Sequence, residues 1–526
     1  MDTDVLIVGA GPTGLMLANQ LIRRGVRAQI IDRHSGPAQQ SRALGVQART
    51  LEIYQKLGIA KRAIELGKVG DGANIWAQGV HMANIPLGAA GGSVTPYPYI
   101  LVLGQDDNEL IMGDKLRELG GSVQWNTELV SLEQSPDKVA ATLKQPDGKK
   151  RTITAKYVAG CDGANSAVRE LNGITFPGAP YEHVFFVADV VCTGSMIADQ
   201  VNVYLFKEGF HLLFPMRGKD HWRVVGILPP GLRGRNDLKF EDTIPSLRQE
   251  AGSNLTFKSC KWFSTYRIHH RHASHFRAGR CFLLGDAAHI HSPVGAQGMN
   301  TGLQDAYNLA WKVALVVKGT AGAALLDTYE EERLPIAQRL LNTTDRGFRL
   351  VVSDSWLAGL FRTKILARIM AFAMSQERIQ KFAFRIVSQT GIRYRKSLLS
   401  KNLNGVPDTA PQAGDRFPWL RLKFSPNGPV EDLFQKLGDL HFNLLVFGQD
   451  APSKELADLG DLLRTHVVPR DFTNDAELSR VQISQPSFFL VRPDGYIGLS
   501  GTSLNAGDLR AYFAQSVFLN SGMTGA

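Results

Sequence analysis

Cysteine is scarce in this chain, and its few copies are scattered. The 526 residues contain four cysteines, Cys161, Cys192, Cys260 and Cys281, and none of them forms a CxxC pair. This pattern argues against a structural zinc site and against the paired disulfides of a secreted domain. It is typical of a protein that works in a reducing compartment.

Long apolar runs are also missing. A membrane-spanning helix needs roughly eighteen consecutive apolar residues. The best candidate, residues 311–317, is interrupted by Lys312 and followed by Lys318. The first residues, MDTDVLIV, carry acidic side chains where a signal peptide would carry basic ones. We therefore expect a cytoplasmic protein without integral membrane contact.

Basic residues are numerous but are not gathered into runs. The formal net charge is +10, yet lysine and arginine are dispersed, whereas nucleic-acid binding favours basic clusters with interleaved aromatic residues. We expect mostly solvated surface, with some charge available to phosphate-bearing cofactors or anionic aromatic substrates. The apolar content of 44% is ordinary for a globular protein, and the length predicts roughly two to four domains.

Histidines gather in residues 267–275, RIHHRHASH, without forming a metal motif. In an extended strand, His270 and His272 would face one way and His269 the other. Two imidazoles on one face are fewer than the three or four ligands of a zinc site, and Arg271 would repel a cation. We expect no bound metal.

A nucleotide-binding pattern opens the chain. Residues 4–8 form an apolar, β-branched run that predicts a strand, and GAGPTG follows at residues 9–14. A helical pattern comes next, then a second strand-like run over residues 26–31 that ends at Asp32. This order is typical of a dinucleotide-binding unit, for FAD and NAD alike.

Each part of this unit has a physical task. Gly9 permits a tight turn, Gly11 lets the backbone approach a pyrophosphate, and Gly14 lets the helix pack closely on the strand. The helix N-terminus offers unpaired N–H groups and a positive dipole end to the phosphates. Asp32 is placed to accept hydrogen bonds from ribose hydroxyls.

Two later motifs also combine a strand with a turn. Residues 157–169, YVAGCDGANSAVR, contain Asp162 and Gly163 at the bend, and residues 281–289, CFLLGDAAH, end in Gly285 and Asp286. The loop PVGAQGMN at residues 293–300 then enters a helix with apolar residues at helical spacing. Its N–H donors suit an electron-rich group such as the edge of a reduced flavin. Asp286 suits a ribityl or ribose hydroxyl.

In this order, the three motifs resemble the single-component FAD-dependent aromatic hydroxylases, the class A flavoprotein monooxygenases that include para-hydroxybenzoate, phenol and polyketide hydroxylases. The resemblance covers about residues 1–345. It implies FAD and NAD(P)H as cofactors, and hydroxylation of a phenolic or polycyclic aromatic substrate with O2 through a flavin C4a-hydroperoxide. Baeyer–Villiger oxidation, epoxidation and a non-catalytic flavin-binding role stay open. A halogenase is disfavoured because no WxWxIP segment occurs.

The resemblance also implies functional residues. The cofactor-binding set is Gly9, Gly11, Gly14, Asp32, Arg33, Arg42, Gln105, Asp162, Gly163, Asp286, Gly295, Gly298, Met299 and Asn300. Pro293, Gly298 and Met299 form the catalytic loop at the flavin edge, with no side-chain base assigned. Arg49 is expected near the isoalloxazine. Gly104 stands before Gln105 where the family has proline. The substrate candidates are Phe206, His211, Phe214 and Arg223.

We predict an α/β fold with a Rossmann-like FAD-binding domain, a β-sheet substrate domain and a thioredoxin-like C-terminal domain without CxxC. The predicted limits are 1–73, 100–180 and 280–345 for the FAD domain, 74–99 and 181–279 for the substrate domain, 346–400 for a helical segment and 401–526 for the C-terminal domain. The helical segment is expected to pack on the FAD domain or on a partner subunit, so a homo-oligomer stays open. The substrate, the site of oxygenation and the choice between NADPH and NADH stay open too.

Overall fold

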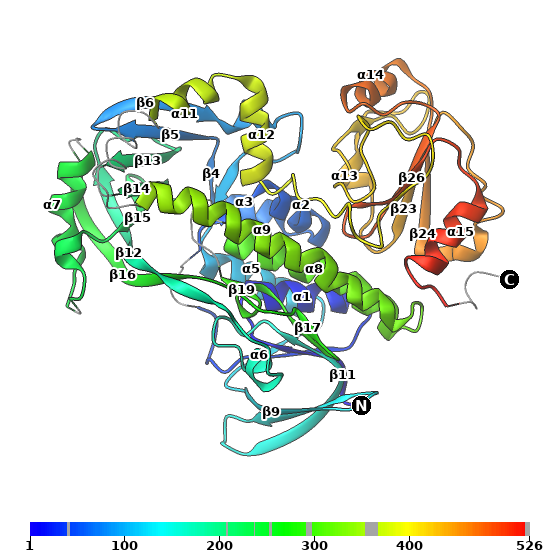
Figure 1. The fold of residues 1–526 in the computed structure, drawn as a ribbon, viewed down its shortest axis with the longest axis horizontal. Coiled ribbons are helices and arrows are strands. Elements are labelled where there is room, and N and C mark those ends of the chain that lie inside the picture. The colour runs from blue at the N-terminus through cyan, green and yellow to red at the C-terminus, as the bar shows by residue number, and fades with distance from the viewer. Residues whose placement is uncertain are drawn as a thin grey trace.

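The computed structural model describes residues 1–38, 43–206, 209–235, 237–251, 255–290, 297–352 and 367–520. Within these ranges, two eight-stranded sheets and one five-stranded sheet, with two smaller ones, are surrounded by helices (Figure 1). The five-stranded sheet and its helices lie to one side of the rest in the chain's last quarter. The predicted α/β class is confirmed.

The first large sheet is parallel at its centre. Its order is β17–β18–β11–β1–β2–β8, where β17 spans Arg277–Ala278. In addition, β10 (Val139–Lys144) pairs antiparallel with β11, and β9 (Glu128–Gln134) pairs antiparallel with β10. The parallel strands are β1 (Thr3–Val8), β2 (Ala28–Ile31), β8 (Val123–Gln124), β11 (Lys150–Gly160) and β18 (Cys281–Leu283). β1 is buried along its whole length. Helices α1 (Pro12–Arg23) and α8 (Gly298–Val317) pack against each other beside this sheet.

The second large sheet is mostly antiparallel, in the order β19–β16–β12–β15–β14–β13–β5–β6. Its strands are β5 (Gly72–Ala77), β6 (Val80–Pro86), β12 (Gly178–Thr193), β13 (Val201–Phe206), β14 (Gly209–Pro215), β15 (His221–Ile227), β16 (Thr256–His272) and β19 (His289–Ile290). Helix α7 (Phe240–Ala251) packs on one face through Phe240 and Leu247. β19 lies beyond the predicted limit of this domain, because it returns from the first sheet to pair with β16.

In the described residues that follow α8, the chain forms helices α9 (Asp327–Val352), α11 (Ala367–Met374) and α12 (Glu377–Val387). Phe384 of α12 packs with Ala48, Leu87 and Ala90, so this helix is attached to both large domains. Among the described residues, none of the helices combines the length and the apolar character needed to cross a membrane.

The C-terminal sheet has the order β20–β26–β25–β23–β24, with β23 and β24 parallel and β25 and β26 antiparallel. Its strands are β20 (Lys401–Asn402), β23 (Phe442–Phe447), β24 (Leu463–Val468), β25 (Ser487–Val491) and β26 (Ile497–Gly501). Helix α15 (Ala506–Gln515) covers one face, and α13 (Leu433–Lys436) and α14 (Phe472–Arg480) cover the other. This is the thioredoxin-like arrangement that the resemblance implied.

Buried charges join the C-terminal domain to α8 and α9. Glu332 accepts hydrogen bonds from Arg492 (2.5 Å) and Lys312 (2.8 Å), and Arg492 also pairs with Asp494. The side chains of Lys312, Glu332 and Arg492 have no exposed surface. Burial alone would raise the pKa of Glu332, but the charges of Arg492 and Lys312 hold it well below its ordinary value. The junction is therefore held by ion pairs that water does not reach.

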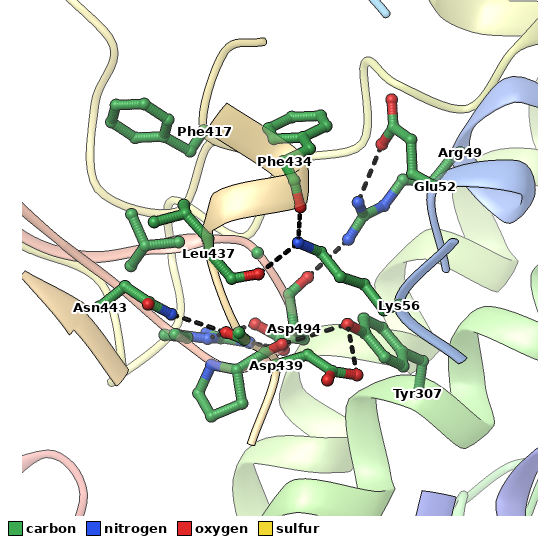
Figure 2. Close-up of a pocket in the computed structure, with 15 residues that line it drawn as sticks. Arg49, Glu52, Lys56, Tyr307, Phe417, Phe434, Leu437, Asp439, Asn443 and Asp494 are labelled. Carbon is green, nitrogen blue, oxygen red and sulfur yellow. Dashed lines mark hydrogen bonds and ion pairs between the residues drawn. The ribbon is translucent and has the colours of Figure 1, made fainter. Parts of the chain in front are cut away.

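A small cavity lies at the same junction (Figure 2). Lys56 points into the C-terminal domain, where its Nζ donates to the carbonyl oxygens of Phe434 and Leu437. Burial lowers the pKa of Lys56 to about 8. The cavity volume is about 30 Å³, which is room for a water molecule and not for a nucleotide or an aromatic ring. It belongs to the domain contact and not to the predicted cofactor site.

Removing the charge of Glu332 should loosen this junction. Glu332→Gln leaves Lys312 and Arg492 buried without their shared partner, and breaking such a pair costs about 3 kcal/mol. The exposed pair of Lys61 and Glu65 offers a matched control, because Glu65→Gln should change stability by less than about 0.5 kcal/mol. Urea unfolding followed by tryptophan fluorescence measures both variants. Equal losses in the two would contradict the role given to the buried cluster.

Candidate functional site

The three sequence motifs meet at one edge of the first sheet. Val8, Gly160 and Leu283 lie in register on β1, β11 and β18. Because these strands are parallel, the residues that follow them leave the sheet at the same edge, as the residue after β2, Asp32, does too. In open α/β sheets this edge is where ligands bind. Segments separated by more than a hundred residues in sequence thus form one site.

The glycines of the first loop are required for different reasons. Gly9 has φ +101°, and a Cβ there would overlap the carbonyl oxygen of Cys161. A Cβ on Gly14 would overlap the carbonyl oxygen of Gly9. At Gly11, in contrast, a Cβ would meet no protein atom within 4 Å. Packing therefore explains the first two, whereas Gly11 borders open space.

That open space lies at the N-terminus of α1. Gly11 caps the helix without a side-chain hydrogen bond, and the first turn contains no acidic residue. Unpaired N–H groups and the positive end of the helix dipole consequently face the space beside Gly11. An anionic pyrophosphate fits this donor set.

Asp32 is fixed beside the same loop. Its Oδ2 accepts a hydrogen bond from the backbone N–H of Ala10 (2.7 Å), and its Oδ1 accepts one from the N–H of His34 (2.8 Å). The side chain keeps 12% exposure, so a hydroxyl can still reach it. Arg33 is exposed next to it. The ribose role of Asp32 and the cofactor role of Arg33 stay predictions.

Asp162 organises the second motif. Its carboxylate accepts hydrogen bonds from the Ser166 hydroxyl (2.5 Å) and the Val168 N–H (3.2 Å), just before α6 (Ala167–Leu171). Burial raises the pKa of Asp162. Gly163 has φ +77°, and a Cβ there would meet only open space. Asp162 therefore shapes the turn, and Gly163 leaves room beside it.

Arg169 connects the second motif to the third. Its guanidinium donates to the carbonyl oxygens of Ala164 (2.9 Å) and Ala287 (3.1 Å) and lies 4.0 Å from the ring centre of Phe176. An exposed carboxylate, Glu170, is 3.8 Å away. The arginine thus does more than pair with a neighbouring acid, because it holds two loops of the site together.

Asp286 lies in the turn Gly285–Ala287 of the third motif. Its side chain is exposed, although Gly285 and Ala287 are buried, and the protein around it still raises its pKa through loss of hydration. The carboxylate is therefore open to solvent at the end of a buried strand. This setting fits a hydrogen bond to a ligand hydroxyl.

Helix α8 contacts this turn. Gln297 caps it without a side-chain hydrogen bond, and Gly298 and Met299 are half-buried at its start. Its first turn has no acidic residue, so its N–H donors suit an electron-rich group. The predicted residues Arg42, Pro293 and Gly295 lie outside the described residues.

The side chain of Asn300 connects α8 to α2 (Ala48–Leu57) and to the residues that precede α2. Its Oδ1 accepts hydrogen bonds from Gln47 N–H (2.9 Å) and Thr50 Oγ1 (2.7 Å), and its Nδ2 donates to the Gly45 carbonyl (2.7 Å). The buried amide thus has a structural role, and the cofactor contact of Asn300 stays a prediction.

Two further predicted residues lie near the same region. Gln105 begins α5 (Gln105–Glu118), and its side chain donates to Glu109 (2.8 Å). Arg49 is buried, and its guanidinium donates to Glu52 (3.0 Å) and to the carbonyl oxygen of Asp494 in the C-terminal domain (2.5 Å). These contacts give Arg49 a role at the domain junction, and its expected place near the isoalloxazine stays a prediction.

A buried acid behind Asp286 was not predicted. Asp305 of α8 accepts hydrogen bonds from the N–H of Gly285 (3.0 Å) and from Arg333 Nε (2.6 Å), and it lies 2.7 Å from His289 Nε2. Burial alone would raise the pKa of Asp305, but the charges of Arg333 and His289 hold it at about 2. The sequence does contain a signal for Asp305, which is an acidic residue among the apolar residues of a predicted helix. Such an acid is rarely buried without a partner, so a buried ion pair could have been inferred.

The four predicted substrate residues divide between the faces of the second sheet. Phe206 and His211 lie on the face that α7 covers, with their rings 4.4 Å apart, and His211 lies beside Phe186. Phe214 and Arg223 pair with each other on the opposite face. Arg223 is buried there in an ion pair with Asp189. One pocket on this sheet cannot be lined by all four.

Comparison with known proteins extends this description. A family model described as FAD binding domain matches residues 2–344. The chain is 33% identical to a 6-methylpretetramide 4-monooxygenase of Streptomyces rimosus over 94% of this chain and 90% of that protein. It is 34% identical to a pentachlorophenol 4-monooxygenase of Sphingobium chlorophenolicum, over 88% and 83%. The structure of an anhydrotetracycline hydroxylase from Streptomyces rimosus superposes with a TM-score of 0.78 at 30% identity, covering 98% and 99%.

The glycine loop yields a paired prediction. Gly14→Ala should destabilise the protein even without FAD, because its Cβ collides with backbone. Gly11→Ala should fold with nearly wild-type stability, because its Cβ meets open space, yet lose roughly tenfold or more in FAD affinity if a pyrophosphate occupies that space. Thermal unfolding of the apoprotein and FAD titration measure the two properties. Unchanged FAD affinity in Gly11→Ala would remove the pyrophosphate from this loop.

Because of the ion pair of Asp305, we expect the stability of the folded chain to fall in acid. Its pKa of about 2 in the folded chain lies below the ordinary value of about 3.9, so its contribution of about 2 kcal/mol is present above pH 4 and lost as pH falls toward 2. Asp305→Asn should thus be less stable than wild type at neutral pH, and the gap should narrow between pH 4 and pH 2. Urea titrations across that range measure it, with the exposed Asp327→Asn as control. A constant gap would contradict the assigned ion pair.

Proposed function

The chain belongs to the FAD binding domain family and is an FAD-dependent monooxygenase, and we propose that it hydroxylates a phenolic or polycyclic aromatic compound with NAD(P)H and O2. The observation that supports this most is the edge of the first sheet, where the glycine loop, the Asp162 turn and the Asp286 turn meet. Relatives that cover most of the chain carry names for oxygenation of a chlorinated phenol and of polycyclic ring systems.

The described residues fit FAD, and we assign them as follows. The N–H groups at the start of α1, beside Gly11, would bind the pyrophosphate, and Asp32 would bind the adenosine ribose. Asp286 would bind the ribityl chain, and the start of α8 at Gly298 and Met299 would face the electron-rich edge of the flavin ring. Bound FAD, reduced by NAD(P)H, supplies the chemistry that activates O2.

The protein's own contribution is orientation, charge and exclusion of water. A helix N-terminus at the flavin edge stabilises negative charge as it develops, without reorganisation. The second sheet provides an apolar wall beside it, since water would degrade the activated oxygen species. No side-chain base is required by this account, and none is assigned.

We place the aromatic substrate on the sheet face opposite α7. On that face Val203 and Leu212 are half-buried among apolar neighbours, and Phe214 is half-buried on the same strand as Leu212. Helix α9 contacts β14 and β16. Figure 1 shows α7 on the outer side of this sheet and α8 and α9 on the other. Phe214 is consequently the substrate candidate that we retain, whereas Phe206 and His211 face α7 and Arg223 is occupied by Asp189. A cytoplasmic location, a homo-oligomer and the predicted domain limits stay predictions.

The test is to purify the chain, record its flavin absorbance and follow NADPH and NADH oxidation with a panel of phenols and polycyclic quinols. We expect bound or bindable FAD, substrate-stimulated oxidation of the nicotinamide and a product heavier by one oxygen atom. Asp286→Ala should retain less FAD than Asp327→Ala, which changes an exposed acid outside the site. Absence of flavin binding would refute the proposal, and a lactone or epoxide product would replace hydroxylation by one of the alternative oxygenations.

A further inference from the structure

One buried carboxylate fixes the turn that carries Asp286. Asp305 accepts a hydrogen bond from the N–H of Gly285, before Asp286, and contacts the ring of His289, after it. Both Asp305 and His289 have no exposed surface. Both ends of the turn are therefore attached to the same carboxylate oxygen, Oδ2 of Asp305 on α8, and the position of Asp286 follows the position of Asp305.

Arg333 of α9 in turn fixes Asp305, and it reaches two other elements. Its Nε donates to Asp305 (2.6 Å), its Nη2 donates to the carbonyl oxygen of Thr301 in the first turn of α8 (3.1 Å), and its Nη1 donates to the hydroxyl of Tyr394 (2.7 Å). The guanidinium is completely buried. A planar guanidinium spreads its donors over three nitrogens in fixed directions, whereas a lysine offers a single nitrogen with rotatable donors.

Tyr394 carries this connection to the C-terminal domain. It lies in the segment between α12 and β20, and its ring centre is 4.3 Å from that of Tyr496. Arg492, the partner of Glu332, lies 5.6 Å from the same ring. Glu332 and Arg333 are neighbours on α9, so this helix contacts the C-terminal domain through one residue and the cofactor turn through the next.

From this arrangement we propose that Arg333 is a positioning residue for the flavin. It sets the distance between the Asp286 turn and the start of α8, and the C-terminal domain contributes to that distance through the Tyr394 hydroxyl. Arg333 does not touch the cofactor, because protein encloses it on every side. The inference rests on the proposed flavin site. It also gives the thioredoxin-like domain, which contains no cysteine, a task in cofactor binding.

The variant that isolates this connection is Tyr394→Phe, which removes only the hydroxyl that accepts from Arg333. Tyr512→Phe is its matched control, because it removes another buried hydroxyl, one that donates to the Leu399 carbonyl (2.9 Å) and has no part in the Arg333 contacts. Arg333→Lys is a second variant that keeps a cation beside Asp305 without the three-way geometry. All are made in the full chain.

The measurements are the FAD dissociation constant from flavin fluorescence, the visible spectrum of bound flavin, and the unfolding temperature without FAD and at a fixed FAD concentration. For Tyr394→Phe we expect the apoprotein to unfold at a lower temperature, because a buried donor of Arg333 loses its acceptor. In addition, we expect a roughly 3- to 10-fold weaker FAD affinity and a smaller FAD-induced rise in unfolding temperature. Arg333→Lys should weaken FAD binding further and alter the flavin spectrum. Tyr512→Phe should lower the unfolding temperature of the apoprotein and keep wild-type FAD affinity.

Three results would overturn the inference. One is wild-type FAD affinity and spectrum in both Tyr394→Phe and Arg333→Lys. Another is equal loss of FAD affinity in Tyr394→Phe and Tyr512→Phe, which would indicate general destabilisation. The third is that Arg333→Lys and Tyr394→Phe are both insoluble while Tyr512→Phe is soluble. This result would mean that the contact between Arg333 and Tyr394 is required for folding. In each case wild type still binds FAD, whereas a wild type that binds no FAD refutes the proposed function itself.

Discussion

Parallel pairing of β11 between β1 and β18 is the constraint on which the site depends. Each of these strands ends in a turn that has little chemistry of its own. The shared direction of the strands brings the turns to one edge, and in open α/β sheets ligands bind in the crevice at that edge. The register at Val8, Gly160 and Leu283 then sets which residues face each other across the cofactor site.

The loops at this edge are held by bonds that cross between motifs. Arg169 spans the second and third turns, Asn300 attaches α8 to Gly45 and Thr50, and Asp305 attaches α8 to Gly285. Such contacts cost desolvation, particularly where charges are buried. In return, these contacts fix the loops in one arrangement. A site that must hold a flavin ring against a substrate requires such an arrangement, because small displacements of the reacting groups lower the reaction rate.

The junction with the C-terminal domain follows the same physical pattern. Lys312, Glu332 and Arg492 are removed from water and satisfy one another. A junction of this kind fixes the orientation of the C-terminal domain, because a displaced domain would leave buried charges without partners. The Pro493-Asp494-Gly495 turn is the part of the C-terminal domain that enters this junction, and Arg49 lies against Gly495.

The sequence was most informative where function depends on local pattern. The glycine loop, Asp32 and the Asp286 turn are short motifs with fixed spacing, and the structure brings them to one edge. The sequence was least informative where the pairing of strands determines which way a side chain faces. The faces of Phe206 and Phe214 depend on the register of β13 and β14, which a run of apolar residues does not specify. Asp305 and Arg49 could be placed only once their partners, Arg333 and Asp494, were known.

The most direct measurement of the central claim is a crystal structure of the chain with FAD. The account predicts the pyrophosphate against the first N–H groups of α1 beside Gly11, with the flavin ring between the start of α8 and the face of the second sheet opposite α7. Density for the dinucleotide at any other edge of the first sheet, or for the flavin ring on the α7 side, would contradict it.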